Sequence, residues 1–568
     1  MSKQHALVEN EGLAHQLFQE KAGKKLGSEK AYAWPLLSAL LQKKQLPYID
    51  FAIAEKLLGE EGEEAHAAFL CHLSLASREG HLCVTLENEA IIPSPELLWK
   101  ACHEESTALA EIQQDDLSTL SHLIVKGGES LPKRLYEGIN GLPLLKRDGN
   151  RIYFFRHWSC ETLFLDHFFR LQETIPKVFP NEQLLKEKID NLITEKKLLP
   201  EQAQAIANIT SHSLSILCGG PGTGKTYTAG MLLKLLWQAL STEQQQQFKM
   251  AIAAPTGKAA SNLQASLNRA TESLTDFPSL KAKTLHTLLG KELTTGVLDA
   301  DLILVDESSM IDVHMMAKLF QAIKPGARLL LLGDPFQLPS IEAGSLFADI
   351  VEACANKSNL TTLKHCMRTE LKSILAFADA VNKGNYLLAK EQLTADPSSL
   401  HHHPLENERE IRPLHLALLK AALSHYPHTL LPGQDPIPLL QQFSRYRILS
   451  PLRQGPLGVD QLNLLFLKAL ASHQKEGTLF IAPIMIATNN HRLELFNGEV
   501  GLLIRKSPAF QSFEEGDYAL FPSQDPENPI RSIPAVLLPR FEYAYCLSVH
   551  KSQGSEFEEL LLLLPEGA

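Results

Sequence analysis

The feature of this chain that most constrains its fold is the glycine-rich segment GGPGTGKT at 219–226. It fits the pattern GxxxxGK[ST], follows the apolar run Leu214–Cys218 and precedes the helix-like stretch Tyr227–Leu240. In this strand–loop–helix setting the glycines let successive backbone N–H groups turn toward a triphosphate. Lys225 then reaches the outer phosphates, and Thr226 offers a hydroxyl to Mg²⁺. The segment therefore predicts a nucleotide site within an α/β domain.

The contacts with the nucleotide are expected along the whole loop and its two flanks. The residues concerned are Gly219, Gly220, Pro221, Gly222, Thr223, Gly224, Lys225, Thr226 and Tyr227.

Length and composition limit the class of protein. A chain of 568 residues is too long for one core, so three or four domains are expected. No leader pattern and no apolar run near the ~20 residues of a membrane span is visible, which favours a cytoplasmic protein. The eight cysteines show no CxxC spacing and fit reduced thiols. A net charge of −11 argues against coating nucleic acid by bulk attraction, but it leaves a local basic groove open.

The chain beyond residue 200 alternates between strand-like and helix-like segments. Four candidate strands end at small or polar residues: Leu214–Cys218, Met250–Ala254, Leu302–Val305 and Leu329–Leu332. This pattern predicts a doubly wound parallel sheet with ligands at the carboxyl ends of its strands. A polar stretch at about 392–442 precedes a second series, Arg447–Ser450, Pro483–Ala487 and Leu547–His550, which predicts a second α/β domain.

These patterns divide the chain into four parts. Residues 1–115 have helical periodicity, as in Tyr32–Leu41 and Phe51–Leu58. A connecting segment, 116–195, contains a strand-like Arg151–Phe155. The first α/β domain is expected at 196–375 and the second at 376–568, with a small β insertion at about 496–540 that opens on the Asn-Gly turn signal of FNGEVG.

Two acidic residues directly follow the third candidate strand, in VDESSM. Asp306 is placed to hold Mg²⁺ through water, and Glu307 to orient an attacking water. Alone, an Asp-Glu pair at a strand end is more often a surface turn. Downstream of a phosphate loop the catalytic interpretation is favoured.

Three further residues are candidates because of their order along the chain. Asp334 and Gln337 lie in GDPFQLPS after the fourth strand, where a glutamine can sense the γ-phosphate. Arg368, in LKHCMRTE, can stabilise charge on the transferred phosphoryl group. Gln202, upstream of the loop, carries an amide that can read the adenine edge. Each of these signals is weak by itself.

Eight elements in this order resemble the superfamily 1 helicases, and among them the RecD family, the α subunit of exodeoxyribonuclease V. They are Gln202, GGPGTGKT (219–226), APTGKAA (254–260), TLHTLLG (284–290), VDESSM (305–310), GDPFQLPS (333–340), Arg368 and SVHKSQGSEF (548–557). SREGHLCVTL (77–86) and RIYFFRHWSCE (151–161) are similar to the amino-terminal region of that family.

The resemblance implies two RecA-like motor domains, an SH3-like β insertion, and an N-terminal helical domain that binds partner subunits. It also implies a 5′→3′ DNA helicase driven by ATP and Mg²⁺, acting on single- and double-stranded DNA with RecB-like and RecC-like partners in double-strand-break repair and recombination. The exonuclease activity would belong to a partner. The implied DNA contacts are Thr256, Lys258, His286, Asn489, His550 and Ser552, and Gly554 and Glu556 would face the nucleotide, Glu556 at its ribose. His286 and His550 alone would otherwise be core histidines.

One departure from the family pattern keeps alternatives open. The chain stops at Ala568, 14 residues after Gly554, whereas the family continues to a TRA-like segment with an arginine at the nucleotide. Either the sequence is truncated or this copy has diverged. This departure motivates the alternative of a nucleotide-binding structural subunit with weak or no hydrolysis. An RNA helicase of the same superfamily is a third, less favoured possibility.

Overall fold

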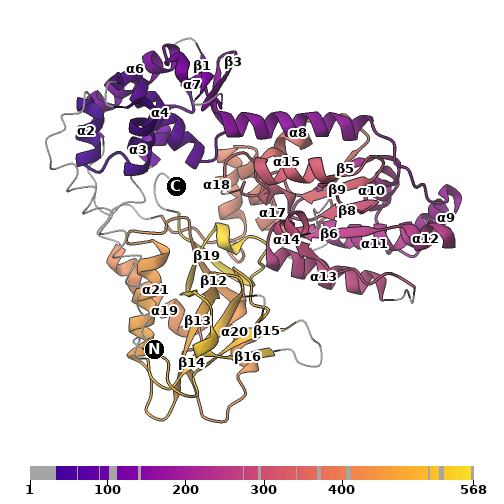
Figure 1. Cartoon of the computed structure of the whole chain (residues 1–568). Helices are drawn as coiled ribbons and strands as arrows, with labels where there is room; N and C mark the ends of the chain where they lie inside the picture. The colour runs from indigo at the N-terminus through magenta and orange to yellow at the C-terminus, as the bar shows by residue number, and fades with distance from the viewer. Residues whose placement is uncertain are drawn as a thin grey trace. The chain divides into compact units, whose positions relative to one another are not determined.

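The structure is a computed structural model (Figure 1), and it describes most of residues 34–564. The ranges outside the description are 1–33, 60–61, 88–89, 102–111, 139–141, 273, 275, 292–295, 341, 367–371, 405–410, 491, 509–511, 524–529 and 565–568. The chain forms two compact units. The first comprises 1–76, 83–103 and 108–153, and the second 77–82, 104–107 and 154–568. Among the helices described, none has the length and apolar character needed to cross a bilayer.

The first unit is mainly helical, as expected, but it also contains a small sheet. Its helices are α2 (Pro35–Gln42), α3 (Tyr48–Leu58), α4 (Glu64–Arg78, whose last two residues belong to the second unit), α5 (Pro95–Ala101), α6 (Gln114–Glu129) and α7 (Lys133–Glu137). The sheet has the order β2-β1-β4-β3, with β1 (Cys83–Glu87), β2 (Ala90–Ile92), β3 (Leu145–Asp148) and β4 (Arg151–Phe154). Helix α6 reaches the backbone of α4 at Gly127, where a Cβ would lie 1.9 Å from the Ala65 carbonyl oxygen.

The phosphate loop lies in a six-stranded sheet of order β10-β5-β9-β8-β6-β7 in which every pairing is parallel. The strands are β5 (Leu214–Gly219), β6 (Met250–Ala254), β7 (Lys283–Thr284), β8 (Leu302–Val305), β9 (Arg328–Gly333) and β10 (Leu360–Leu363). All four predicted strands are present, and the predicted parallel sheet is confirmed.

Both faces of this sheet are buried, which explains why its strands read as continuous apolar runs. Alternate residues of each strand enter different cores: Leu329 and Leu331 of β9 belong to one, Leu330 and Leu332 to the other. The first core also receives α8 (Phe155–Glu173), α14 (Leu285–Lys291), α15 (Val313–Ala322) and α16 (Leu346–Ala353). The second receives α9 (Glu182–Thr194), α10 (Pro200–Ser211), α11 (Lys225–Ala239) and α13 (Gly257–Thr271).

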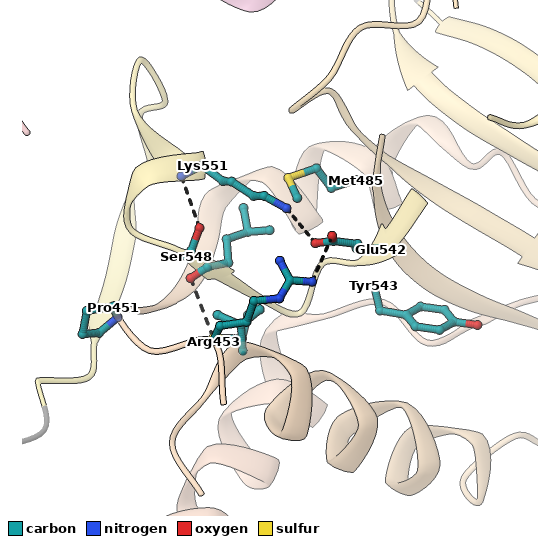
Figure 2. A pocket seen from close by; sticks show the side chains of 10 residues that line it. Pro451, Arg453, Met485, Glu542, Tyr543, Ser548 and Lys551 are labelled. Carbon is teal, nitrogen blue, oxygen red and sulfur yellow. Dashed lines mark hydrogen bonds and ion pairs between the residues drawn. The ribbon is translucent and has the colours of Figure 1, made fainter. Parts of the chain in front are cut away.

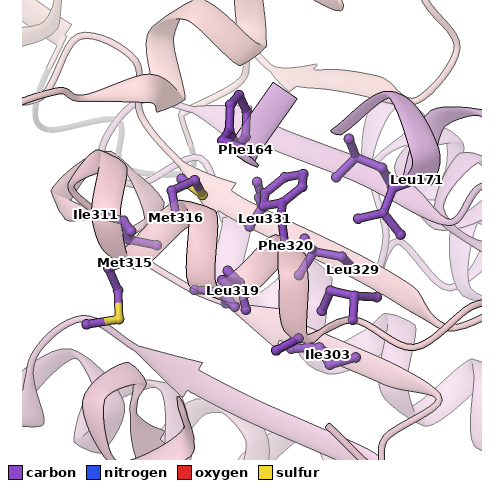
Figure 3. Close-up of a cluster of buried hydrophobic side chains, with 14 of the residues drawn as sticks. Phe164, Leu171, Ile303, Ile311, Met315, Met316, Leu319, Phe320, Leu329 and Leu331 are labelled. Carbon is purple, nitrogen blue, oxygen red and sulfur yellow. The ribbon is translucent and has the colours of Figure 1, made fainter. Parts of the chain in front are cut away.

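Helix α8 packs into the first core of the parallel sheet. Phe164 lies edge-on against Phe320 of α15, with ring centroids 4.9 Å apart (Figure 3). Leu171 of the same helix joins this cluster. The sequence had placed these residues only in a connecting segment.

The second strand series is divided between two sheets. Strand β12 (Tyr446–Ser450) pairs in parallel with β18 (Cys546–Ser548) and β19 (Glu559–Leu562). The predicted strand Pro483–Ala487 instead belongs to β13 (Leu479–Ile486), in an antiparallel sheet with β11 (Thr429–Leu430), β14 (Val500–Arg505), β15 (Tyr518–Pro522), β16 (Ile530–Pro534) and β17 (Phe541–Tyr543). The predicted strand Leu547–His550 also ends early, because His550–Ser552 form a turn of 3₁₀ helix.

The segment 496–540 is built from β14, β15 and β16, which continue the sheet of β13. Its Asn497–Gly498 turn is present: Glu499 N donates to Phe496 O at 3.0 Å, and Gly498 has φ +85. The SH3-like description of this segment and the four-part division of the chain stay predictions.

The remaining elements of the second unit are mostly helical. They are α12 (Thr242–Gln247), α17 (Lys372–Asn382), α18 (Tyr386–Ala395), α19 (Ile411–His425), α20 (Ile437–Arg445) and α21 (Val459–Ala471), with 3₁₀ turns at Ser308–Met310 and Ala535–Leu537.

Candidate nucleotide and nucleic-acid site

The phosphate loop joins the end of β5 to the start of α11. Gly222 and Gly224 have φ +72 and +85, a region that side chains rarely adopt. Lys225 Nζ donates to Gly219 O at 2.6 Å and to Gly220 O at 3.1 Å. The lysine is therefore already folded over the loop, with its charge where phosphate oxygens would lie.

Thr226 and the acidic pair meet at the start of α11. Thr226 Oγ1 donates to Asp306 Oδ2 at 3.1 Å, and Glu307 N donates to Asp306 Oδ1 at 2.8 Å. Burial raises the pKa of Asp306, and hydrogen bonds from Glu307 N and Thr226 and the charge of Lys225 oppose this rise. The carboxylate is thus held by fixed donors at the strand end, where the sequence had placed it.

Glu307 lies beside it in an acidic and buried setting. Burial raises the pKa of the Glu307 carboxyl to about 7, with Asp306 and Asp334 adding to the rise and Lys225 opposing it. Burial likewise raises the pKa of Asp334, and the Phe336 N–H and the charge of Lys225 oppose that rise. These mutual effects place Lys225 and the three carboxyl groups in one site.

Gln337 lies in the loop after β9, three residues beyond Asp334. Asp334 Oδ1 accepts a hydrogen bond from Phe336 N at 3.1 Å, and Gln337 N donates to Asp334 O at 3.2 Å. These bonds fix the tip of the loop. Gln337 Oε1 is buried and accepts no hydrogen bond from any residue that the structure describes. An amide oxygen in this state is free to accept a hydrogen bond from a water or a ligand.

A loop from the second strand series reaches this site. A Cβ on Gly554 would lie 3.9 Å from Glu307 Oε1, and Gln553 Nε2 donates to Leu338 O at 2.9 Å. Lys258 Nζ donates to Ser555 Oγ nearby. Residues 553–555 thus lie beside Glu307, the loop of Leu338 and the first turn of α13, three segments that follow strands of the parallel sheet. The sequence pointed to Gly554 but missed Gln553 and Ser555, although all three lie in SVHKSQGSEF.

Known proteins with similar sequences identify the family of this chain. Residues 197–404 match the family described as AAA domain. The chain is 31% identical over 446 residues to the RecBCD enzyme subunit RecD of Mycolicibacterium smegmatis, covering 74% of each chain. The chain belongs to the RecD family. The RecD of Haemophilus influenzae is 28% identical, over 73% of this chain and 72% of its own.

The solved Pif1 helicase of Candida albicans also matches this RecD-family chain, at 18% identity over 64% of this chain and 88% of that one. Its TM-score is 0.34.

Gln202, the candidate for adenine in this RecD-family chain, also has a structural task. Its Oε1 accepts a hydrogen bond from Leu199 N at 3.0 Å and so caps α10. Its Nε2 lies 2.9 Å from the place of a Cβ on Gly224, so the amide lies against the phosphate loop. Tyr227 turns its hydroxyl to Lys197 O at 2.9 Å.

Two further residues were predicted to act at the nucleotide, Arg368 and Glu556. Arg368 lies outside the described residues, although the segment leading to it is anchored: Glu201 accepts hydrogen bonds from Lys364 N and His365 N at 3.1 and 3.0 Å. Glu556 is exposed.

The candidate DNA contacts of the first motor sheet differ in exposure. Thr256 Oγ1 caps α13 by accepting from Ala259 N at 3.2 Å, while Lys258 is half-buried against Ser555. Burial lowers the pKa of Lys258. His286 is exposed on α14, so it is not a core histidine.

The candidate DNA contacts of the second motor lie in loops. Asn489 Oδ1 accepts from Asn497 N at 2.8 Å, and Ser552 Oγ donates to Val549 O at 2.7 Å. His550 is exposed at the start of its 3₁₀ turn.

Proposed function

We propose that this chain is an ATP-dependent 5′→3′ DNA helicase, the motor subunit of a RecBCD-type helicase–nuclease complex in double-strand-break repair and recombination. The observation that carries the proposal is the approach of Gly554 to the Glu307 carboxylate. A loop of the second motor thereby lies beside the group that would orient the attacking water. Hydrolysis and movement of the two motor sheets can then be linked.

The residues of the site divide the work of hydrolysis. The phosphate-loop backbone and Lys225 bind the β- and γ-phosphates, and Glu307 orients the water. Gln337 offers a free amide oxygen to the same water or amide hydrogens to the γ-phosphate. Arg368 would complete the site from the segment that Glu201 anchors. Gln202 and Tyr227 would face the adenine side, and Glu556 the ribose.

The donor set fits Mg²⁺. Thr226 and Asp306 offer a hydroxyl and a carboxylate oxygen, the hard ligands that this ion prefers, with most of its shell left for water and phosphate. No cluster of three or more His, Cys, Asp or Glu side chains suited to a metal occurs among the described residues, so the phosphates would supply further ligands. Bound Mg²⁺ would neutralise charge on the phosphoryl oxygens.

The DNA strand would be held mostly through its phosphates and sugars. Thr256, Lys258 and His286 would contact it from the first motor, and Asn489, His550 and Ser552 from the second. Alternating affinity of the two motors in the two nucleotide states then gives direction. RecB-like and RecC-like subunits are the proposed partners, and the cytoplasm the proposed location.

The alternative of a structural subunit with weak hydrolysis is not favoured. Glu307 and Gln337 have proposed roles in hydrolysis rather than in binding: the Glu307 carboxylate lies beside Gly554, and the Gln337 amide oxygen accepts no hydrogen bond from any residue that the structure describes. A subunit that only bound nucleotide would not require them.

The Lys225→Gln variant tests the proposal. Loss of the lysine charge should reduce ATPase stimulated by single-stranded DNA at least about 100-fold, because this charge stabilises the transferred phosphoryl group. Lys318→Gln, on the exposed side of α15, is the matched control and should keep wild-type turnover. Full activity in Lys225→Gln would contradict the motor assignment, and equal stimulation by RNA of matched length would contradict the preference for DNA.

A further inference from the structure

Two cationic side chains occupy equivalent places in the parallel sheet of β12, β18 and β19, here called the second motor sheet. Strands β12 and β18 are parallel neighbours in which Ser450 pairs with Ser548. Arg453 and Lys551 each follow the end of their strand by three residues. Both therefore lie at the carboxyl edge of a parallel sheet, the edge at which such sheets bind ligands.

A carboxylate from the other sheet lies between the two cations (Figure 2). Glu542 is on β17, paired with Met485 of β13. Its Oε2 accepts from Lys551 Nζ at 2.7 Å, and its Oε1 from Arg453 Nη2 at 3.2 Å. Each oxygen of one anion thus receives one cation.

These three residues line a pocket of about 90 Å³, which we call the phosphate pocket. Its other walls include Val459, Met485 and Leu547, which are buried and apolar. The cations remain open to solvent: the side chains of Arg453 and Lys551 are 55% and 31% exposed. Arg453 has a second partner at the rim, since its Nε contacts Asp460 Oδ2 at 3.2 Å.

We propose that the phosphate pocket binds a backbone phosphate of single-stranded nucleic acid, and that Glu542 is an internal anion which the phosphate displaces. Two non-bridging oxygens of a phosphodiester match the two carboxylate oxygens that the cations now hold. The apolar wall suits the face of a sugar or a base. Two residues of its lining, Ser548 and Lys551, are also within four positions along the chain of the candidate DNA contacts His550 and Ser552. The inference rests on the proposed function. It adds to that function a binding site for one backbone phosphate and a carboxylate, Glu542, that competes with the phosphate.

The competitor suits a protein that must release the strand at every step. When the phosphate leaves, Glu542 returns to the cations, so Arg453 and Lys551 are paired with an anion in both states. Binding at this site is then an exchange of anions. Its net gain is smaller than that of two free cations, which favours rapid release.

The structural alternative is that Glu542 only ties β17 to the motor sheet. The two interpretations differ in the sign of one effect. If Glu542 competes with phosphate, removing its charge strengthens nucleic-acid binding. If it is only a tether, removing its charge weakens the fold and leaves binding unchanged or weaker.

The first motor sheet offers a matched control. Asp299 also bridges two cations: it contacts Lys249 Nζ, and its Oδ1 lies 3.4 Å from Lys324 Nζ. Asp299 and Lys249 precede β8 and β6, so this cluster lies at the amino edge of its sheet, away from the ligand edge. Asp299→Asn and Glu542→Gln change the net charge equally, and each removes one carboxylate from two cations, of which one keeps a second partner: Arg453 keeps Asp460, and Lys324 keeps Asp301.

The experiment measures binding of the nucleotide-free chain to a fluorescent oligo(dT) by anisotropy, between 50 and 200 mM salt. Glu542→Gln should bind about 5- to 10-fold more tightly than wild type at the lowest salt. The slope of log K against log[salt] should steepen by about 0.7, the value for one more phosphate of a single strand. Asp299→Asn should change affinity less than 2-fold. The double variant Arg453→Gln/Glu542→Gln should return to wild-type affinity or below.

Each outcome is decisive once thermal melting shows that a variant is folded. If Glu542→Gln and Asp299→Asn increase the affinity for oligo(dT) equally, the increase comes from the change in net charge alone, and the proposal is overturned. The proposal is also overturned if Glu542→Gln does not increase the affinity. Free tripolyphosphate is tested as a competitor of oligo(dT). If Glu542→Gln binds tripolyphosphate more tightly by the same factor as oligo(dT), the assignment to a nucleic-acid strand is contradicted. If Glu542→Gln does not fold, Arg453→Gln alone must lower affinity and the salt slope, or the proposal is wrong. Failure of wild-type protein to bind any oligonucleotide would instead contradict the proposed helicase.

Discussion

Glu307 adopts an unfavourable backbone conformation within the candidate site. Its φ of +52 is in the left-handed region, which costs a side chain on the order of 1 kcal/mol. The bond from its N–H to Asp306 holds it there. In this conformation its carboxylate turns toward Gly554 of the second motor. A strained residue that lies between Asp306 and the loop of Gly554 is suited to respond to both.

His157 of α8 carries a prediction about pH. Its side chain is 5% exposed, and burial, helped by the charge of Arg156, lowers its pKa to about 4. Because the unfolded chain has the ordinary pKa near 6.5, it takes up the proton first as pH falls. The contribution of His157 to stability is therefore complete above about pH 6.5 and is lost progressively toward pH 4.

Replacing His157 should remove part of this acid sensitivity. Between pH 7 and pH 5, His157→Gln should lose about 1 kcal/mol less of its free energy of unfolding than wild type does, measured by denaturant titration. His122→Gln, at an exposed site on α6, is the control. A wild-type pH dependence in His157→Gln would show that this histidine is not the group responsible.

Helix α11, which follows the phosphate loop, packs closely against helix α13. Gly230 of α11 faces α13, where a Cβ would lie 2.7 Å from Ala270 Cβ. Gly230→Ala should therefore lower the free energy of unfolding by about 1 kcal/mol or more, despite the better helix propensity of alanine. In Gly290→Ala, on α14, the added Cβ meets nothing within 4 Å, and stability should stay level or rise by up to about 1 kcal/mol. Equal thermal shifts in the two variants would refute this account of the α11–α13 contact.

The elements that could be predicted are those whose signal is local. Leu302–Val305 is fully apolar because both faces of its strand are buried, so its bounds and the acidic pair after it were visible in the sequence. Pro483–Ala487 was assigned to the wrong kind of sheet because an apolar run does not reveal whether its partners are parallel or antiparallel. Strand β10 was missed because Thr361 and Thr362 break its apolar pattern.

Side-chain pairs within the site were harder to predict than strands. Lys258 and Ser555 are 297 positions apart, and Gln553 and Leu338 are 215 apart. The same limit hid the phosphate pocket, since Glu542 comes from β17 and its cations from two loops of another sheet. No spacing in the sequence encodes such contacts, because they depend on how the two strand series pack.

Within the second unit, a few loops connect the residues that are candidates for nucleotide binding with the residues that are candidates for nucleic-acid binding. Gln553 contacts the loop of Gln337, Gly554 approaches Glu307, and the next turns of the chain toward β18 hold Ser552, His550 and Lys551. A change at the γ-phosphate can therefore reach a DNA contact within a few residues of chain. Directional movement requires that the two nucleotide states hold the strand with different strength.

The most direct test of the account is the affinity of the wild-type chain for oligo(dT) in three states: without nucleotide, with ADP, and with a non-hydrolysable ATP analogue. The account predicts that the affinities with and without the ATP analogue differ at least about 10-fold, or about 1.4 kcal/mol of coupling. It also predicts that Lys225→Gln abolishes the difference. Equal affinities in all three wild-type states would contradict it.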